Sequence, residues 1–459
     1  MRLPVFFPLS AGKLFAAILI VAAVDSLPPA GLCADSLGES GMQRITTFGE
    51  FSAEAAGADA DMPEFAGPIR ERSTLTGDWR GRRSRWSDRG ITLDVSATQY
   101  YQGVAAGGLE QAFQYGGRND YFLNVDGEKL GLGQGFSIAL HGETRYGESA
   151  GSVAGTLLSP NLLLAFPLAN GDVTALTGVT LTQNLSERLQ VYGGKLNTLD
   201  DFAQPLTGAD NFSGFQNTAM LYNPVFARTV PYSTFGAGFA LLENEEALFS
   251  VTVYDTNDTP TVSGFETFFN NGATVYTEWN LTTTFFDRPG HHGLSGTYST
   301  GTYSDLTPTA YLDPIAGLVV VSTPVSGSWC AAYNFDQALY VSPDDPQRMW
   351  GVFGNFGMAD NNPSPVRWFA SAGISGASFL ARRPADSFGF AYFYLGVSES
   401  LKNLAPLLLP VRDEHGIELY YNMALTPWCQ ITPNLQVMTP FRDRADTALI
   451  FGLRAHVIF

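Results

Sequence analysis

The sequence predicts an all-β fold: a transmembrane antiparallel up-and-down β-barrel of about sixteen strands, with a short N-terminal periplasmic segment. Apolar and polar residues alternate from Ile91 to the C-terminus in segments of roughly ten residues, the length of a tilted strand that crosses a membrane. Clusters of Gly, Pro, Asn and Asp separate these segments, and the links alternate between short and long. The last strand is amphipathic and stops on the aromatic residue Phe459. A chain that ends in this way favours a barrel over an ordinary soluble sheet, whose long exposed edge would invite aggregation.

Residues 1–34 have the order of a secretory signal peptide. Positive charge precedes an apolar run from Leu14 to Val24, and small residues follow up to Ala34. A run of about eleven residues is too short to span a membrane, which needs about twenty, so a cleaved signal is preferred to a retained anchor. The bulky Leu32 before Cys33 argues against a lipoprotein site. We therefore expect cleavage near Ala34.

Composition also favours a barrel. Charged residues make up only 15% of the chain, whereas a globular domain carries about 25%. The outer face of a barrel meets lipid rather than water and needs fewer charges, although a large secreted β-sandwich would have a similar composition. The formal net charge of −18 predicts that nucleic acid and anionic lipid headgroups are repelled and are not partners.

The final segment, Leu449 to Phe459, shows the alternation most clearly. Its odd positions are apolar, while Arg454 and His456 stand at even positions, so one face suits lipid and the other a polar lumen. Short turns, assigned to the periplasmic rim, are expected near Lys129–Gly133, Asn184–Glu187, Glu243–Glu246, Asp287–Gly290, Ser342–Pro346, Arg382–Asp386 and Thr426–Pro433. Opposite links are expected near Gly103–Arg118, Arg145–Gly171, Leu199–Thr234, Asn257–Ala273, Ser304–Ser328, Asp360–Pro365, Lys402–His415 and, shorter, Arg442–Asp446. A barrel this wide leaves an aqueous channel.

The predicted topology separates the two cysteines that remain after the signal peptide. Cys330 begins a strand at the outer rim, whereas Cys429 lies in a periplasmic turn. A bilayer thickness between them far exceeds the ~7 Å limit between the Cα atoms of a disulfide. We predict two unpaired thiols.

Residues 35–90 differ from the rest of the chain. The sequence is rich in Ala, Gly, Asp and Glu up to about Gly67, and a basic run with Trp86 follows. This composition predicts a periplasmic lead-in with a short amphipathic helix against the lower end of the barrel, residues 91–459. A wholly disordered tail is the alternative for the first half of the segment.

Several short blocks resemble the carbohydrate-selective porin (OprB) family in their order and spacing. These blocks are Leu75-Thr76-Gly77-Asp78-Trp79, Arg89-Gly90-Ile91, Tyr192-Gly193-Gly194-Lys195-Leu196-Asn197, Gly351 to Asp360, Arg383-Pro384-Ala385-Asp386, Glu418 to Asn422, Leu425 to Trp428 and Thr432 to Gln436. The likeness extends from about Leu75 to Phe459. Arg80 after Trp79 and Cys429 after Trp428 depart from the family pattern. The resemblance implies a water-filled outer-membrane channel for passive diffusion of small sugars.

Strand parity supplies candidates for the lumen wall. Carboxylates accept hydrogen bonds from sugar hydroxyls, Arg and Asn donate to them, and aromatic faces pack against C–H surfaces. For any single residue the alternative is a charge pair that only stiffens the wall. The candidates for solute contact are Asp126, Glu143, Arg145, Glu278, Arg367, Glu418, Asn422 and Arg454.

Other functions find less support in the sequence. No enzyme motif, metal-ligand pattern or cofactor site is recognised among the five histidines or elsewhere. A general, weakly selective porin for small hydrophilic solutes is the main alternative, and a plugged receptor would need about 22 strands. Expected partners are small sugars, outer-membrane lipid and lipopolysaccharide, and the barrel-assembly machinery through Phe459. Both a monomer and a homotrimer fit the pattern.

Overall fold

The computed structural model describes residues 65–168, 171–200, 206, 212–243, 246–307, 309–313, 317–321, 323–346, 348–404 and 410–459. The predicted signal peptide and the first part of the N-terminal segment lie outside the described residues. Within the described part of the chain, no helix combines the length and the apolar composition needed to cross a membrane.

Eighteen strands are described. Their bounds are β1 (Ile91–Gly108), β2 (Phe113–Asp126), β3 (Phe136–Gly147), β4 (Val173–Ser186), β5 (Leu189–Asn197), β6 (Ser233–Glu243), β7 (Glu246–Asp255), β8 (Ala273–Phe285), β9 (Arg288–Tyr303), β10 (Thr309–Asp313), β11 (Gly317–Val321), β12 (Val325–Val341), β13 (Met349–Ala359), β14 (Val366–Ala377), β15 (Ser387–Val397), β16 (Glu414–Thr426), β17 (Cys429–Thr439) and β18 (Asp446–Ile458). The helical segments are α2 (Arg82–Asp88), α3 (Gly151–Ala154), α4 (Thr218–Leu221), η2 (Pro224–Arg228), η3 (Phe265–Thr267) and α5 (Glu399–Leu404).

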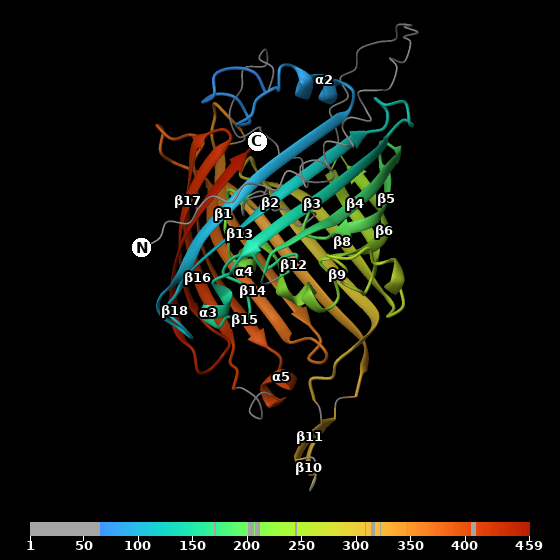
Figure 1. Ribbon diagram of the computed structural model, residues 1–459, viewed down its shortest axis with the longest axis vertical. Helices are drawn as coiled ribbons and strands as arrows, with labels where there is room; N and C mark the ends of the chain where they lie inside the picture. The colour runs from blue at the N-terminus through green and yellow to red at the C-terminus, as the bar shows by residue number, and fades with distance from the viewer. Residues whose placement is uncertain are drawn as a thin grey trace. The chain divides into compact units, whose positions relative to one another are not determined.

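Sixteen of these strands close into one antiparallel barrel, which confirms the predicted fold class. Each strand pairs with its neighbours in the chain, and β1 closes the barrel against β18. β10 and β11 form a separate two-stranded sheet in the link between β9 and β12. Figure 1 shows α2 and the short turns at one end of the barrel, with α5 and the β10–β11 hairpin at the other.

Several predicted links differ in extent. Most of Asn184–Glu187 lies in β4 and most of Asp287–Gly290 lies in β9, and two further links are much shorter than expected. The link expected at Gly103–Arg118 spans only 109–112, because the Gly- and Ala-rich end of β1 stays paired with β18 through two bulges. Two consecutive glycines with positive φ, Gly107 and Gly108, permit this path. The turn expected at Thr426–Pro433 is also shorter, because β17 already begins at Cys429.

Cys429 is therefore the first residue of a strand rather than part of a turn. Cys330 lies within β12, where its partners in the sheet are Thr297 and Ala359. Both thiols are free, as predicted.

The strands alternate between an outer apolar face and an inner face. In β18, Phe451 and Leu453 are 45% and 47% exposed, whereas Arg454 and His456 are buried. The inner face is not polar throughout, because Phe353 and Phe393 are also fully buried. Residues of the link between β5 and β6 cover this apolar part of the inner face, and they form part of the candidate site described below.

The segment before β1 is fastened to the end of β18. The Leu75 N–H donates to the Ile458 carbonyl at 2.8 Å. The buried Arg83 guanidinium donates to the backbone oxygens of Phe459 at 2.7 Å and Leu93 at 3.0 Å. Arg83 also lies 4.7 Å from the ring centroid of Trp79. One side chain thus ties the N-terminal segment to both strands of the closing seam.

Replacing Arg83 with Gln is expected to destabilise the folded barrel by about 3 kcal/mol, because two charge-assisted hydrogen bonds at the seam are lost. The folded and heat-denatured forms can be separated by gel electrophoresis in detergent, and the Arg83→Gln variant should convert at a clearly lower temperature. Arg82→Gln is the matched control, because Arg82 is exposed and makes no ion pair among the described residues. Equal transition temperatures for wild type and Arg83→Gln would contradict the role of the seam.

Candidate functional site

The link between β5 and β6 folds into the barrel. We call its described residues 212–232 the inner loop; they include α4 and η2. Asn217 and Asn223 cap these two helical turns through their side-chain oxygens. α4 lies against β15, and η2 lies against β12, β13 and β14. The inner loop comes directly before β6 and packs inside the barrel against β12–β15, which follow much later in the sequence (Figure 1).

A buried carboxylate on β16 holds the inner loop. Glu418 is 0% exposed and accepts hydrogen bonds from the backbone N–H groups of Gln216 at 2.7 Å and Asn217 at 2.9 Å. It also accepts from the Asn434 amide at 2.5 Å. Backbone N–H groups that are buried need such partners, because an unsatisfied donor costs about 1–3 kcal/mol.

Arg454 on β18 holds the same loop from the neighbouring wall. Its guanidinium donates to the Gly214 carbonyl at 2.9 Å and to the Thr432 hydroxyl at 3.1 Å. The Thr432 hydroxyl in turn donates to the Asn422 side-chain oxygen at 2.7 Å. Asn422 therefore contacts other residues of the barrel wall, and neither of its side-chain hydrogen bonds reaches the inner loop.

Apolar packing completes the attachment. Phe215 is fully buried, with its ring centroid 5.5 Å from that of Phe353 and 4.8 Å from that of Tyr420. Both ring pairs are edge-to-face, which contributes about 0.5–1.5 kcal/mol each beyond the area that they bury. The inner loop therefore packs through Phe215 against the inward-facing aromatic residues of β13 and β16.

A second loop, residues 148–168 after β3, also lies against the inner wall. Glu414 on β16 accepts from the N–H groups of Leu157 at 2.6 Å and Leu158 at 2.9 Å. Arg145 on β3 donates to the carbonyl oxygens of Leu164 at 3.2 Å and Gly171 at 2.6 Å. Glu414 and Glu418 thus fix one loop each, four residues apart on the same strand.

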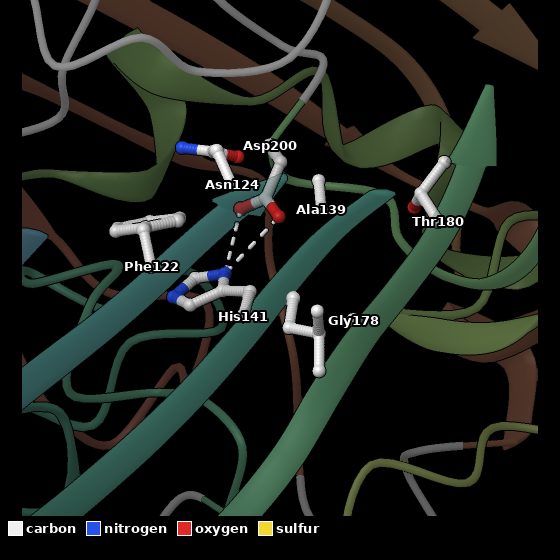
Figure 2. Close-up of a pocket in the computed structure, with 8 residues that line it drawn as sticks. Phe122, Asn124, Ala139, His141, Gly178, Thr180 and Asp200 are labelled. Carbon is white, nitrogen blue, oxygen red and sulfur yellow. Dashed lines mark hydrogen bonds and ion pairs between the residues drawn. The ribbon is translucent and has the colours of Figure 1, made fainter. Parts of the chain in front are cut away.

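A small pocket lies on the wall formed by β2, β3 and β4 (Figure 2). Phe122, Asn124, His141, Thr180 and Asp200 are among the residues that line it. Phe122 stacks on the His141 ring, with the centroids 4.0 Å apart. The His141 Nδ1 atom lies 3.0 Å from the Asp200 carboxylate, which precedes the inner loop in the chain. Asn124 and Thr180 make no side-chain hydrogen bond within the described part of the chain.

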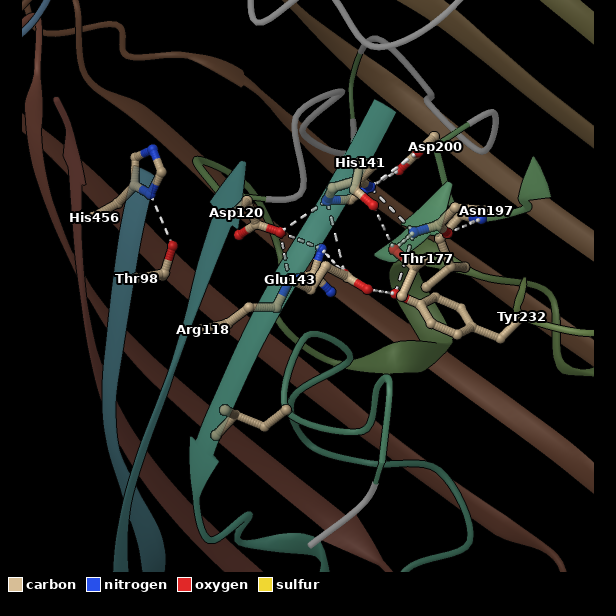
Figure 3. A network of polar contacts seen from close by, with 12 residues as sticks. Thr98, Arg118, Asp120, His141, Glu143, Thr177, Asn197, Asp200, Tyr232 and His456 are labelled. Atoms are coloured by element: carbon tan, nitrogen blue, oxygen red, sulfur yellow. Dashed lines mark hydrogen bonds and ion pairs between the residues drawn. The ribbon is translucent and has the colours of Figure 1, made fainter. Parts of the chain in front are cut away.

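A buried charge network lies beside this pocket (Figure 3). The Arg118 guanidinium is 2.6 Å from both Asp120 and Glu143, whose side chains are 0% exposed. His141 Nε2 lies 3.2 Å from Asp120, so the ring bridges the strand wall and Asp200. The Tyr232 hydroxyl donates to Glu143 at 2.5 Å. Burial and the neighbouring Glu143 raise the pKa of Tyr232, which keeps this phenol a hydrogen-bond donor.

The geometry of this network bears on metal binding. Asp120, His141 and Glu143 place potential ligand atoms within 4.8 Å of one another. The Arg118 guanidinium already lies at hydrogen-bond distance from both carboxylates and supplies the positive charge there. We assign no metal to this cluster.

The structure places the residues predicted for solute contact in five different surroundings. Glu418, Asn422 and Arg454 lie together at the anchor of the inner loop, and Glu143 and Arg145 share the inner face of β3. Asp126 is the last residue of β2, where it accepts from the Lys129 N–H at 3.1 Å. Glu278 is half-buried on β8 beside Tyr276 and Asn280. Arg367 is exposed at a bulge in β14, where alternation no longer sets the direction of the side chain.

Several residues of the site escaped the sequence analysis. Arg118 was counted in a link, although Arg118, Asp120, Phe122 and Asn124 follow the two-residue period of an inward face. Glu414 shares the inward parity of Glu418 and could have been found in the same way. Asp200 and Tyr232 lie in a link, and only the folded chain brings them to the wall.

A closed sixteen-strand barrel with an inward-folded loop defines the class of outer-membrane porins. The family model described as "Carbohydrate-selective porin, OprB family" matches residues 110–459, and the chain belongs to this family. Its fold and family are those of a channel in the outer membrane of Gram-negative bacteria, rather than those of an enzyme.

Individual relatives support the fold. Porin B of Pseudomonas aeruginosa is 26% identical over 192 residues, which is 37% of this chain and 41% of Porin B. The match thus spans about two fifths of that relative. The high-pH structure of Pseudomonas putida OprB has a TM-score of 0.74 at 21% identity, over 86% of this chain and all of that one. Its low-pH structure has a TM-score of 0.54 at 18% identity, over 85% of this chain and 99% of that one.

Proposed function

We propose that the barrel is a water-filled channel through which small sugars cross the outer membrane by passive diffusion. The observation that carries this proposal is the asymmetry of the lumen. The inner loop is fixed to β13, β16 and β18 through Phe215, Glu418 and Arg454. Its last residue, Tyr232, reaches Glu143 on β3, beside a small pocket that Asn124, Thr180 and Asp200 help to line. The family to which the chain belongs is described as carbohydrate-selective.

We further propose that residues 1–34 are removed on export and that residues 35–90 stay in the periplasm. We also propose that the barrel-assembly machinery recognises Phe459.

The pocket offers the groups that a polyhydroxyl solute needs. Asn124 can donate and accept, the Thr180 hydroxyl can do both, and the Asp200 carboxylate accepts from sugar hydroxyls. Behind the pocket, Arg118 pairs with both Asp120 and Glu143, and the His141 ring lies beside Asp120. A neutral solute therefore meets hydrogen-bonding groups in a lumen wall whose buried charges are already paired.

This assignment changes the role proposed for part of the predicted set. We propose that Glu418 and Arg454 hold the constriction from behind the inner loop, that Asn422 supports the wall beneath Arg454 through Thr432, and that Glu143 and Arg145 stiffen the β3 wall. Asp126, Glu278 and Arg367 lie elsewhere and are proposed only as wall residues of the passage. Direct contact with sugar is assigned to Asn124, Thr180 and Asp200.

Liposome swelling with the refolded chain tests the function. Neutral monosaccharides and disaccharides are compared with amino acids of similar size, and faster swelling with the sugars is expected. Swelling that follows solute size alone would contradict sugar selectivity and leave a general porin for small hydrophilic solutes. A correctly folded protein that gives no swelling would contradict transport.

The Asn124→Ala/Thr180→Val double variant is expected to slow sugar-driven swelling by about fivefold to thirtyfold, since each of the two lost hydrogen bonds is worth about 0.5–1 kcal/mol. Swelling with a size-matched amino acid should change much less. Asn334→Ala is the matched control, because Asn334 is a half-buried amide on β12, away from the pocket. An equal loss for both solutes would show an altered pore width and contradict a sugar-contacting pocket.

A further inference from the structure

We propose that the periplasmic end of the barrel carries a binding site for anionic phospholipid headgroups on α2. The site is a basic face made of Arg82, Arg85 and Arg89, which lie at positions i, i+3 and i+7 and therefore on one side of the helix and its C-cap. All three side chains are exposed, whereas Arg83 on the other side of the helix is buried. This proposal concerns the outside of the rim and is independent of what passes through the lumen.

The basic face has no acidic partner within the described chain. None of its three arginines takes part in an ion pair, although ion pairs form elsewhere in the described chain. Arg85 donates its Nε proton to the Gly81 carbonyl at 2.8 Å, which fixes the side chain along the helix and neutralises no charge. The three guanidinium groups are therefore exposed without a counter-charge from the described part of the protein.

The local charge is opposite to that of the whole chain. The formal net charge is −18, and it predicts that anionic lipid headgroups are repelled. Residues 65–90 nevertheless contain seven Arg against three Asp and Glu, a local charge of +4. A charge concentrated within one short segment acts over about a Debye length, roughly 8–10 Å, so the local sign decides what binds there.

The position of the basic face points to lipid rather than to a soluble acidic partner. Arg89 precedes Ile91 by two residues, which is about 7 Å along an extended chain. Ile91 is paired with Val125 on the outward, apolar face of β1 and β2. The basic face thus lies within one headgroup layer of the lipid-facing band. Anionic headgroups at this level meet the arginines while their acyl chains meet the strands.

A neighbouring turn adds apolar anchors. The Lys129 Nζ atom donates to the Ser87 carbonyl at 3.4 Å, which places the β2–β3 turn beside α2. Leu130 and Leu132 of this turn are 36% and 61% exposed. Exposed leucines next to arginines are typical of protein surfaces that lie in a membrane interface.

The test measures lipid binding by the folded, full chain in a neutral detergent. Retention of phosphatidylglycerol and phosphatidylcholine is followed by native mass spectrometry, for wild type and for the Arg82→Gln/Arg85→Gln/Arg89→Gln variant. Each arginine near an anionic surface contributes about a fivefold change in affinity, so the triple variant should bind phosphatidylglycerol on the order of a hundredfold more weakly. Phosphatidylcholine should bind weakly and equally to both proteins. Sugar-driven swelling by the triple variant should match wild type and report that the barrel is folded.

Arg442→Gln/Arg444→Gln is the control variant, since these two exposed arginines lie in the link at the opposite rim. It should retain the phosphatidylglycerol affinity of wild type. The proposal is overturned if the α2 triple variant binds phosphatidylglycerol as wild type does, or if the opposite-rim variant loses as much. It is also overturned if soluble glycerol phosphate occupies the site as tightly as phosphatidylglycerol, because a membrane surface would then add nothing and a soluble anionic ligand would be the better occupant.

Discussion

Replacing Glu418 with Ala is expected to release the inner loop and widen the passage. The substitution leaves the N–H groups of Gln216 and Asn217 without their acceptor and removes the partner of Asn434. A loss of about 3 kcal/mol at these contacts shifts the loop toward detached states by about a hundredfold. Swelling with a trisaccharide, expected to be slow for wild type, should become several-fold faster, while swelling with a monosaccharide should change little.

Asn422→Ala is the matched control for this prediction. Asn422 lies on the same strand and is also buried, but its hydrogen-bond partners Gln430 and Thr432 belong to the wall. Its removal should leave the size limit of wild type. Should Glu418→Ala fail to fold, Glu418→Gln retains one acceptor oxygen and should give a partial increase. An unchanged size limit in a folded Glu418→Ala protein would refute the loop anchor.

Replacing Arg118 with Met is expected to have the largest effect on stability. The guanidinium lies 2.6 Å from both Asp120 and Glu143, and all three side chains are buried. Its loss leaves two carboxylates close together in a buried site, with the His141 ring as their remaining neighbour. Breaking a buried ion pair by removing one partner costs about 3–5 kcal/mol. The temperature at which the folded form disappears in detergent should fall accordingly.

Second-site changes separate this electrostatic effect from a simple loss of packing. If charge is responsible, Glu143→Gln or Asp120→Asn in the Arg118→Met background should recover much of the lost stability. If the cavity left by the shorter side chain is responsible, neither change should help. A stable Arg118→Met protein would contradict the account of the network.

The fold could be predicted because its signals are local. A two-residue period and turn residues at regular spacing specify strands with two faces, and these are readable in β18 without knowledge of any other strand. The prediction was wrong at the end of β1. Its Gly- and Ala-rich composition suggested a link, but pairing with β18 keeps this segment extended as a strand.

The candidate site could be predicted only in part, because its contacts join distant positions. Parity placed Glu418 and Arg454 on the inner face, but their partners in the inner loop lie about 200 positions earlier in the chain. Phe353 and Phe393 contradict the expectation of a polar lumen, and only the presence of Phe215 and the rest of the loop explains them. A loop has no periodic alternation of polar and apolar residues, so its inward course could not be predicted from the sequence.

Ion current through the refolded channel in a planar bilayer, titrated with a neutral disaccharide, tests the central claim most directly. A water-filled passage with a sugar-contacting wall predicts a steady open current that the disaccharide reduces to a saturating limit. The same titration of Asn124→Ala/Thr180→Val should need several-fold more sugar for half of the effect. No current from a folded channel, or a decrease that grows linearly with sugar and never saturates, would contradict the account.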